Sequence, residues 1–274
     1  MSARVVLARA AVQVLADGVA ARVLHIKGET TDPQLGGPQQ PGTDVDALVH
    51  PDDIPRMDRA LREHGWRVYS SFTFGSPFEH AQTYAHETWG YFDLHRRFPG
   101  IGLPDRPAFE MLWPTRIHRD DAGIRYATPG VDAQAIVQVL NAVRNGRPTP
   151  AFWTDADEEQ KTRRLALVRE LHAEVAVAAA LGELESMKDH REYLLWRFTV
   201  QGGPRVVEWW ARVVAQPNWR AAVRVAAQAP RVNTDQLTHR LGHEPSRGEI
   251  AREFGARLVR GAREGLGLVR RSRS

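Results

Sequence analysis

The pattern of apolar residues changes once along the chain, near residue 130, and this change constrains the fold more than any other feature. Before it, short apolar runs alternate with stretches rich in glycine, proline and serine, as expected for strands separated by turns. After it, apolar residues recur at helical spacing almost to the end of the 274-residue chain. We therefore expect an α+β protein with two domains, a sheet-containing domain over residues 1–130 and an all-helical domain over residues 131–274.

The first domain is expected to hold a mixed β-sheet with flanking helices. Apolar runs bounded by turn residues predict its strands, and the first 19 residues and the segment after Pro51 predict helices. Pro51 suits the first turn of a helix, and Gly65 ends the pattern. The predicted strands are 22–26, 45–49, 66–69, 82–86 and 91–95, and the predicted helices are 1–19 and 51–64.

The second domain is expected to contain helices only. Asn145-Gly146 and two prolines end its first helix, and four early acids favour the start of the next one near Asp155. Four tryptophans, Trp196, Trp209, Trp210 and Trp219, fall within these helices, which favours places in the core. The predicted helices are 132–144, 155–181, 184–200, 204–215, 218–229 and 246–271.

Composition excludes several classes of protein. The chain has no cysteine, which rules out disulfides, thiolate metal sites and cysteine nucleophiles. No apolar run reaches the roughly 20 residues that cross a bilayer. Arg4, Arg9 and Asp17 interrupt the N-terminal apolar residues, so the first helix does not resemble a signal peptide and we expect a cytoplasmic protein with no membrane contact.

Charge is distributed unevenly between the two halves. Residues 1–130 hold 14 Lys and Arg against 16 Asp and Glu, and residues 131–274 hold 23 against 17. A basic helical half could attract anions, but its arginines are not interleaved with aromatic residues in a nucleic-acid-binding pattern. DNA is therefore not an expected partner, and polyanion binding by this half stays an alternative.

Two aspartates in one predicted strand are the main candidates for chemistry. Asp44 and Asp46 are two residues apart, so both side chains leave the same face of the strand while Val45 points to the other. Two carboxylates this close repel each other unless a cation lies between them. Rigid carboxylate oxygens suit Mg²⁺, which completes its shell with water and phosphate oxygens.

A third aspartate lies in a similar setting further along the chain. Asp93 is the one charged residue among the apolar neighbours of the predicted strand 91–95. If that strand lies beside 45–49, the three aspartates form one cluster that can hold two metal ions. Arg96 and Arg97 follow directly and could clamp a phosphate, although a surface pair explains them equally well.

These residues resemble a known family. The chain is similar to the bacterial group described as nucleotidyltransferase family proteins, within the polymerase-β type of nucleotidyltransferases, over about residues 23 to 98. The likeness rests on Lys27-Gly28, Asp44-Val45-Asp46-Ala47-Leu48-Val49, the helix from Pro51, Gly65-Trp66-Arg67 and Phe92-Asp93-Leu94-His95. It implies a nucleotidyltransferase-type sheet domain in residues 1–130.

The resemblance also implies roles for individual residues. It makes Asp44 and Asp46 metal ligands, Asp93 the third carboxylate and Gly28 the loop glycine near the phosphates. Lys27 would contact the phosphates as well. The cofactor would be Mg²⁺, or Mn²⁺ in its place, and the co-substrate an NTP such as ATP.

The implied reaction is transfer of an NMP unit from the NTP to a hydroxyl or phosphate of an acceptor. The acceptor is unknown and could be a small molecule, a peptide or tRNA. An alternative is a catalytically inactive nucleotide-binding or interaction protein on the same fold. Two features favour this alternative. Glu29 follows Gly28 where the superfamily usually has serine or glycine, and residues 37–42 contain no arginine.

The histidines are less informative. His95 could contact a substrate, but a hydrogen bond at a sheet edge is the preferred interpretation. His80 and His86 are six residues apart with no third ligand in the sequence, so we expect no zinc site.

Overall fold

The computed structural model describes residues 3–37, 42–75, 78–228 and 231–256. Contacts divide the chain into two compact units, residues 1–180 and 181–274. The helices α5 (Val131–Arg144) and α7 (Glu158–Glu170) therefore belong to the same unit as the sheet. The domain boundary at residue 130 stays a prediction.

The first unit is built on a five-stranded mixed sheet, as predicted. Its strand order is β1-β2-β5-β4-β3, with β2 and β5 parallel and every other pair antiparallel. The parallel pair is central, which places the two aspartate-bearing strands side by side. The strands are β1 (Val23–Ile26), β2 (Asp44–Val49), β3 (Arg67–Ser70), β4 (Ala81–His86) and β5 (Gly90–His95).

One face of the sheet is apolar and packs against two helices. Val45, Ala47 and Val49 point to this face because alternate side chains of a strand share a face. They join buried residues of α1 (Ala3–Gly18) and α2 (Ile54–Glu63) in one hydrophobic cluster. A single turn, η3 (Pro51–Asp53), leads into α2 as the proline and two aspartates predict.

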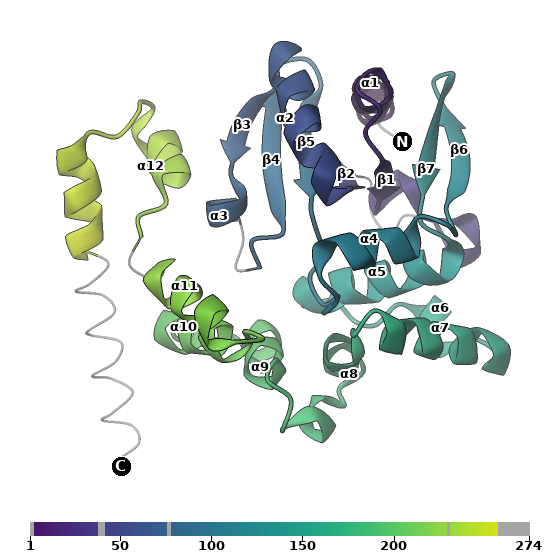
Figure 1. Cartoon of the computed structure of the whole chain (residues 1–274). Helices are drawn as coiled ribbons and strands as arrows, with labels where there is room; N and C mark the ends of the chain where they lie inside the picture. The colour runs from purple at the N-terminus through teal and green to yellow at the C-terminus, as the bar shows by residue number, and fades with distance from the viewer. Residues whose placement is uncertain (1–2, 38–41, 76–77, 229–230, 257–274) are drawn as a thin grey trace. The chain divides into compact units, whose positions relative to one another are not determined.

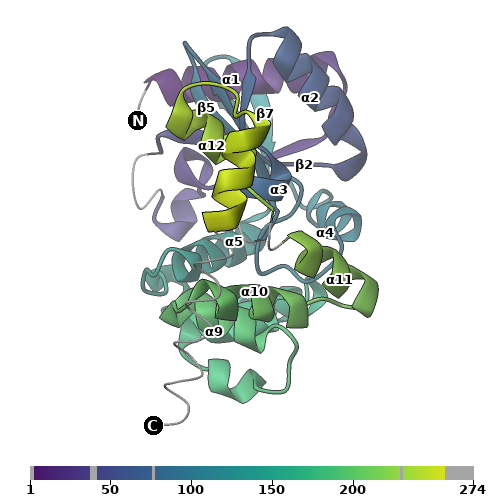
Figure 2. The ribbon, with the colours of Figure 1, turned by 90° about the vertical axis from the view of Figure 1, so that its left-hand side faces the viewer.

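The opposite face carries the polar residues of β2 and β5. Asp44, Asp46 and Asp93 lie on it, and α5 is the helix on this side. Figures 1 and 2 show α1 above β1 and β2, and α5 below them. The aspartates therefore lie in the layer between the sheet and α5.

A hairpin that the sequence analysis did not predict follows the short helix α4 (Asp105–Leu112). It consists of β6 (Ile117–Asp121) and β7 (Ile124–Thr128). Ala122 and Gly123 both have positive φ, 50° and 76°, as the central residues of a tight hairpin turn do. Polar or charged residues fill every position of β6 after Ile117, so no apolar run marked it as a strand.

The predicted single helix 155–181 is wrong. The structure has a turn α6 (Ala151–Thr154), then α7, then α8 (Glu174–Leu181). Asp157 caps α7 in a capping box with Gln160, and His172, at φ 52°, ends the helical path. The N–H of Gly102 donates to the carbonyls of Leu171 and His172, and these tertiary hydrogen bonds interrupt a segment that has no glycine or proline of its own.

The second unit is helical in its described residues, as predicted. Its elements are η4 (Leu184–Met187), α9 (Tyr193–Gln201), α10 (Arg205–Val214), α11 (Trp219–Gln228) and α12 (Thr234–Leu241), and residues 247–256 are also helical. The predicted helix 184–200 is divided into η4 and α9, and residues 257–271 of the last predicted helix lie outside the described residues.

The tryptophans of this unit do not all lie in a core. Trp196 is buried, as predicted, but Trp210 and Trp219 are 61% and 71% exposed, so the core prediction is wrong for these two. Both lie on amphipathic helices, where helical spacing alone does not say which face is covered. Within the described ranges of the chain, no helix combines the length and the apolar character needed to span a membrane.

Candidate functional site

The parallel pairing of β2 and β5 brings the predicted carboxylates together. Asp46 is the register partner of Asp93, and Asp44 lies two residues earlier on the same face of β2. Neighbouring strands are roughly 4.8 Å apart, so Asp46 and Asp93 are close enough to interact strongly. The three aspartates named from the sequence thus share one face of the sheet.

Asp46 is held by two partners. The ammonium of Lys27 forms an ion pair with its Oδ1, and His95 Nε2 donates to the same oxygen at 2.8 Å. Burial alone would raise the pKa of Asp46, but Lys27 and His95 lower it to about 2. Asp46 is therefore an anion at every physiological pH, which makes it a permanent acceptor or cation ligand.

The backbone before the first loop positions Lys27. Lys27 and Gly28 both have positive φ, 62° and 52°, at the end of β1. This conformation costs a non-glycine residue roughly 1 kcal/mol or more. The carbonyl of Lys27 accepts hydrogen bonds from the N–H and the hydroxyl of Thr30, which hold the turn η1 (Gly28–Thr30) in place.

Asp93 and Asp44 have the opposite electrostatic character. Burial and then the charge of Asp46 raise the pKa of Asp93 to about 6, although Thr83 donates to its Oδ1 at 2.6 Å. Burial and the charge of Asp46 also raise the pKa of Asp44. One aspartate of the cluster therefore stays ionised, while Asp93 can gain or lose a proton near neutral pH.

The donor set around Asp46 fits a divalent cation. One carboxylate oxygen each from Asp46 and Asp93 and an imidazole nitrogen of His95 all lie within 4.8 Å of one another. Carboxylate oxygens are the ligands of Mg²⁺, and Mn²⁺ also accepts imidazole. His95 is the third member of this group, and Asp44 lies on the same face of β2, at the adjacent cavity.

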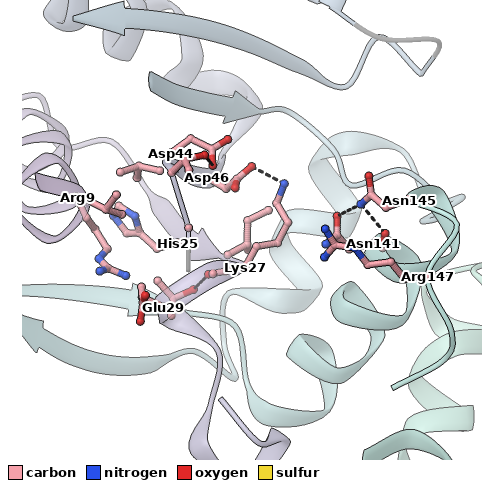
Figure 3. A pocket seen from close by; sticks show the side chains of 16 residues that line it. Arg9, His25, Lys27, Glu29, Asp44, Asp46, Asn141, Asn145 and Arg147 are labelled. Atoms are coloured by element: carbon pink, nitrogen blue, oxygen red, sulfur yellow. Dashed lines mark hydrogen bonds and ion pairs between the residues drawn. The ribbon is translucent and has the colours of Figure 1, made fainter. Parts of the chain in front are cut away.

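A cavity of about 340 Å³ is lined by Asp44 and Asp46, whereas Asp93 is not among its lining residues. Figure 3 shows the Lys27–Asp46 pair between its two ends, with Arg9 and His25 on one side and Asn141, Asn145 and Arg147 on the other. The backbone of Gly28 lines it next to Glu29. The full lining is Val5, Arg9, His25, Ile26, Lys27, Gly28, Glu29, Thr30, Gly42, Thr43, Asp44, Val45, Asp46, Asn141, Asn145 and Arg147.

A cation that the sequence analysis missed lies beside the cluster. Arg144, in the last turn of α5, has its guanidinium 5.9 Å from the ring centres of both Phe78 and Phe98, and its Nη1 is buried with no hydrogen-bond partner. The pKa of Arg144 is lowered, because burial outweighs the charges of Asp46 and Asp93, which act to raise it. Arg144 therefore adds positive charge to the carboxylate cluster from a helix distant in sequence.

Arg96 and Arg97 are not among the residues that line the cavity. Arg96 Nε donates to the carbonyl of Glu79 at 2.8 Å, and Arg97 Nε lies 3.0 Å from Asp105 Oδ1. Both guanidinium groups thus have local partners, and a phosphate clamp by this pair stays a prediction.

Sequence reasoning missed the residues that α5 and the turn after it contribute. Asn141, Arg144, Asn145 and Arg147 occur in a segment whose helical pattern was clear, but nothing in it marks proximity to β2. His95 did carry a signal, since it is two residues from Asp93 and therefore on the same face. The strand alternation alone could have placed it in the site.

No family model and no curated protein matches this chain. Two solved structures resemble it in part. One is the crystal structure of lincosamide antibiotic adenylyltransferase LnuA with lincomycin bound, at 15% identity over 47% of this chain and 82% of that one, with a TM-score of 0.35. The other is the solution structure of antibiotic-resistance factor ANT(2'')-Ia, at 13% identity over 68% and 95%, with a TM-score of 0.38. At these TM-scores and identities the two structures say nothing about the function of this chain, and its own residues are the basis for a proposal.

Proposed function

We propose that this chain is a nucleotidyltransferase that moves an NMP unit from an NTP to a hydroxyl or phosphate of an acceptor and releases pyrophosphate. One observation carries the proposal. Asp44, Asp46 and Asp93 share a face of two adjacent parallel strands, and Asp44 and Asp46 line a cavity together with Lys27 and Gly28. Such a carboxylate cluster next to phosphate-binding groups is the arrangement that phosphoryl-type transfer requires.

The aspartates would hold Mg²⁺, or Mn²⁺ in its place. Asp46 is ionised and Asp93 is its register partner, so both offer oxygens on one side of the sheet. Asp44 offers a further carboxylate at the cavity, and a ring nitrogen of His95 is an additional metal ligand. Bound there, the metal would neutralise the phosphate charge and polarise the α-phosphorus toward attack.

Asp93 is suited to accept the proton of the acceptor hydroxyl. Its pKa of about 6 lies near neutrality, where a general base is most effective. Thr83 donates to Oδ1 and so fixes the orientation of the carboxyl group, leaving Oδ2 for the proton. The hydroxyl oxygen would then attack the α-phosphorus, and the bond to the leaving pyrophosphate would break.

Lys27, Gly28 and the end of α5 would bind the phosphates. The main chain at Gly28 has no side chain to keep a phosphate away, and the Lys27 ammonium is a point charge at the centre of the cavity. Arg147 lines the cavity from the opposite side. Positioning by these groups would supply most of the catalysis, together with the metal.

A nucleotide-binding protein without turnover is the second candidate. The carboxylate of Glu29 lines the same cavity, where it opposes a triphosphate by like-charge repulsion. This candidate predicts metal-dependent NTP binding without pyrophosphate release.

Calorimetric titration of the four NTPs, with and without Mg²⁺, tests the proposal. The wild type should bind at least one NTP in a Mg²⁺-dependent manner, and Asp44→Asn/Asp46→Asn should lose that binding. Equal binding by wild type and double variant would refute the assignment of the site. Release of labelled pyrophosphate in the presence of candidate acceptors then separates turnover from binding alone.

A further inference from the structure

Two buried polar residues line the end of the cavity away from α5. Arg9 of α1 is 3% exposed and His25 of β1 is fully buried, yet both belong to the cavity wall. Tyr126 of β7 packs against both, 5.1 Å from the Arg9 guanidinium and edge-on to the His25 ring at 5.3 Å. The two side chains therefore lie next to each other at one place in the cavity.

The hydrogen bonds around His25 determine its tautomer. Gln13 Nε2 donates to Asp17 Oδ1 at 2.7 Å, so Gln13 Oε1 is the atom that faces His25 Nε2 at 3.0 Å. His25 must then carry its proton on Nε2, and Nδ1 has a free lone pair. Burial and then the charge of Arg9 lower the pKa of His25 to about 3, so the ring is neutral near pH 7.

Nδ1 of His25 and Nε of Arg9 are both buried without a hydrogen-bond partner. A buried polar atom left unpaired costs roughly 1–3 kcal/mol, so its presence needs a reason. Arg9 Nη2 lies 2.9 Å from Asp121 Oδ2, so this carboxylate balances the charge of the guanidinium. These two cavity-lining residues therefore hold one unpaired donor and one unpaired acceptor in a locally neutral setting.

We propose that Arg9 and His25 form a recognition site for the hydrogen-bonding edge of a nucleobase. Arg9 Nε would donate to a ring nitrogen or carbonyl oxygen of the base, and His25 Nδ1 would accept from its N–H. Every nucleobase has such an acceptor beside a donor on its pairing edge. This inference rests on the proposed function, because it identifies the part of the NTP that this end of the cavity binds.

Charge favours a neutral planar group here over a second anion. An anion would meet the lone pair of His25 Nδ1 and the carboxylate of Asp121, which already neutralises Arg9. The positive groups Lys27 and Arg147 lie at the centre and at the other side of the cavity (Figure 3). The base and the phosphates of one nucleotide would thus occupy opposite sides of Asp46.

Binding of adenosine, cytidine, guanosine and uridine to the full chain tests this inference, because nucleosides lack phosphates and need no metal. We expect at least one to bind wild type and Asp44→Asn/Asp46→Asn with equal affinity. His25→Phe keeps an aromatic ring but removes Nδ1 together with Nε2, and Arg9→Lys keeps the charge but removes Nε. Each variant should weaken binding by roughly tenfold, the scale of one lost hydrogen bond.

His50→Phe is the matched control. His50 is also buried, 1% exposed, and lies edge-on to Phe109 at 5.2 Å, but it is not part of the cavity wall. The His50→Phe variant should lose about as much unfolding free energy as His25→Phe. It should bind nucleosides like wild type. Melting curves show whether each variant is folded. If His25→Phe does not fold, the comparison of Arg9→Lys with wild type decides the test.

The outcomes separate this inference from the proposed function. Nucleoside binding that His25→Phe and Arg9→Lys weaken, with no transfer activity in any assay, supports the inference and argues against the enzyme. Mg²⁺-dependent NTP binding that neither variant changes supports the nucleotide site and overturns the inference. Failure of all four nucleosides to bind overturns it as well.

Discussion

Asp46 and Asp93 lie directly opposite each other on the parallel strands β2 and β5, on the face of the sheet that points toward α5. Two carboxylates one strand apart cannot both be ionised without compensation. The structure compensates them unequally, because Lys27 and His95 both contact Asp46, whereas Thr83 donates a hydrogen bond to Asp93. This asymmetry separates their pKa values to about 2 and about 6.

Asp93→Asn should stabilise the metal-free protein at pH 8. The pKa of Asp93 is raised above its usual 3.8 to about 6, so its stability contribution is complete below pH 4 and is lost as pH rises through 6. Asparagine removes that loss and can still accept from Thr83. We expect a gain of roughly 1–2 kcal/mol in the free energy of unfolding at pH 8 and almost none at pH 4, measured by urea unfolding with a chelator.

Asp58→Asn is the control for this prediction, with the opposite sign. Burial opposes ionisation of Asp58, but hydrogen bonds from Arg62 and Tyr84 lower its pKa. This variant should lose stability at pH 8. A loss of stability in Asp93→Asn of similar size would contradict the raised pKa.

Asp44→Asn and Asp46→Asn should differ in stability but not in function. The pKa of Asp44 is raised, so neutralising it costs no stability, whereas Asp46 loses its ion pair with Lys27. Both variants should lose Mg²⁺-dependent NTP binding, and only Asp46→Asn should unfold more easily, by roughly 1–3 kcal/mol. Calorimetry with matched melting curves checks both parts, and full NTP binding by folded Asp44→Asn would remove this residue from the site.

Lys27→Met should make the protein more dependent on metal. Without the ammonium, Asp46 is a buried anion whose remaining partner is His95, so the apo protein should lose stability at pH 8. Mg²⁺ should then raise the melting temperature more than in wild type, because no ammonium competes for Asp46. Lys161→Met, which removes an exposed lysine paired with Glu158, should show the wild-type response.

Arg144→Met should weaken NTP binding by roughly tenfold without loss of stability. Its guanidinium is costly to bury because Nη1 has no partner, and methionine can replace its packing against Phe78 and Phe98. Arg116→Met removes another arginine that stacks on an aromatic ring, Trp113, but in the segment between α4 and β6, and this variant should bind NTP like wild type. Unchanged NTP affinity in Arg144→Met would make this residue purely structural.

Gly102→Ala should destabilise the first unit strongly. A Cβ at this position would lie 2.6 Å from the carbonyl oxygen of His172, at the break between α7 and α8. We expect a loss of roughly 2–4 kcal/mol in unfolding free energy. Gly18→Ala meets nothing within 4 Å and should be neutral or mildly stabilising, so equal effects of the two variants would contradict the tight packing at Gly102.

Local patterns predicted most of the elements correctly. The strands of the sheet and the helices α1, α2 and α5 follow from alternation, helical spacing and terminal residues, which act within a few residues of chain. Local patterns did not predict the hairpin β6–β7 or the break at His172. The strand β6 has polar or charged residues at every position after Ile117, and the break depends on hydrogen bonds from Gly102, far away in sequence.

In the candidate site, the shared face of Asp44 and Asp46 can be predicted from the sequence, because side-chain alternation is a property of a single strand. Which residues meet them depends on how distant segments pack together. Strand order and register place Asp93 opposite Asp46, α1 brings Arg9 to the cavity wall, and α5 brings Arg144 close to Asp46 and Asp93. Such pairings join distant segments through the energy of the whole fold, and no local period in the sequence encodes them.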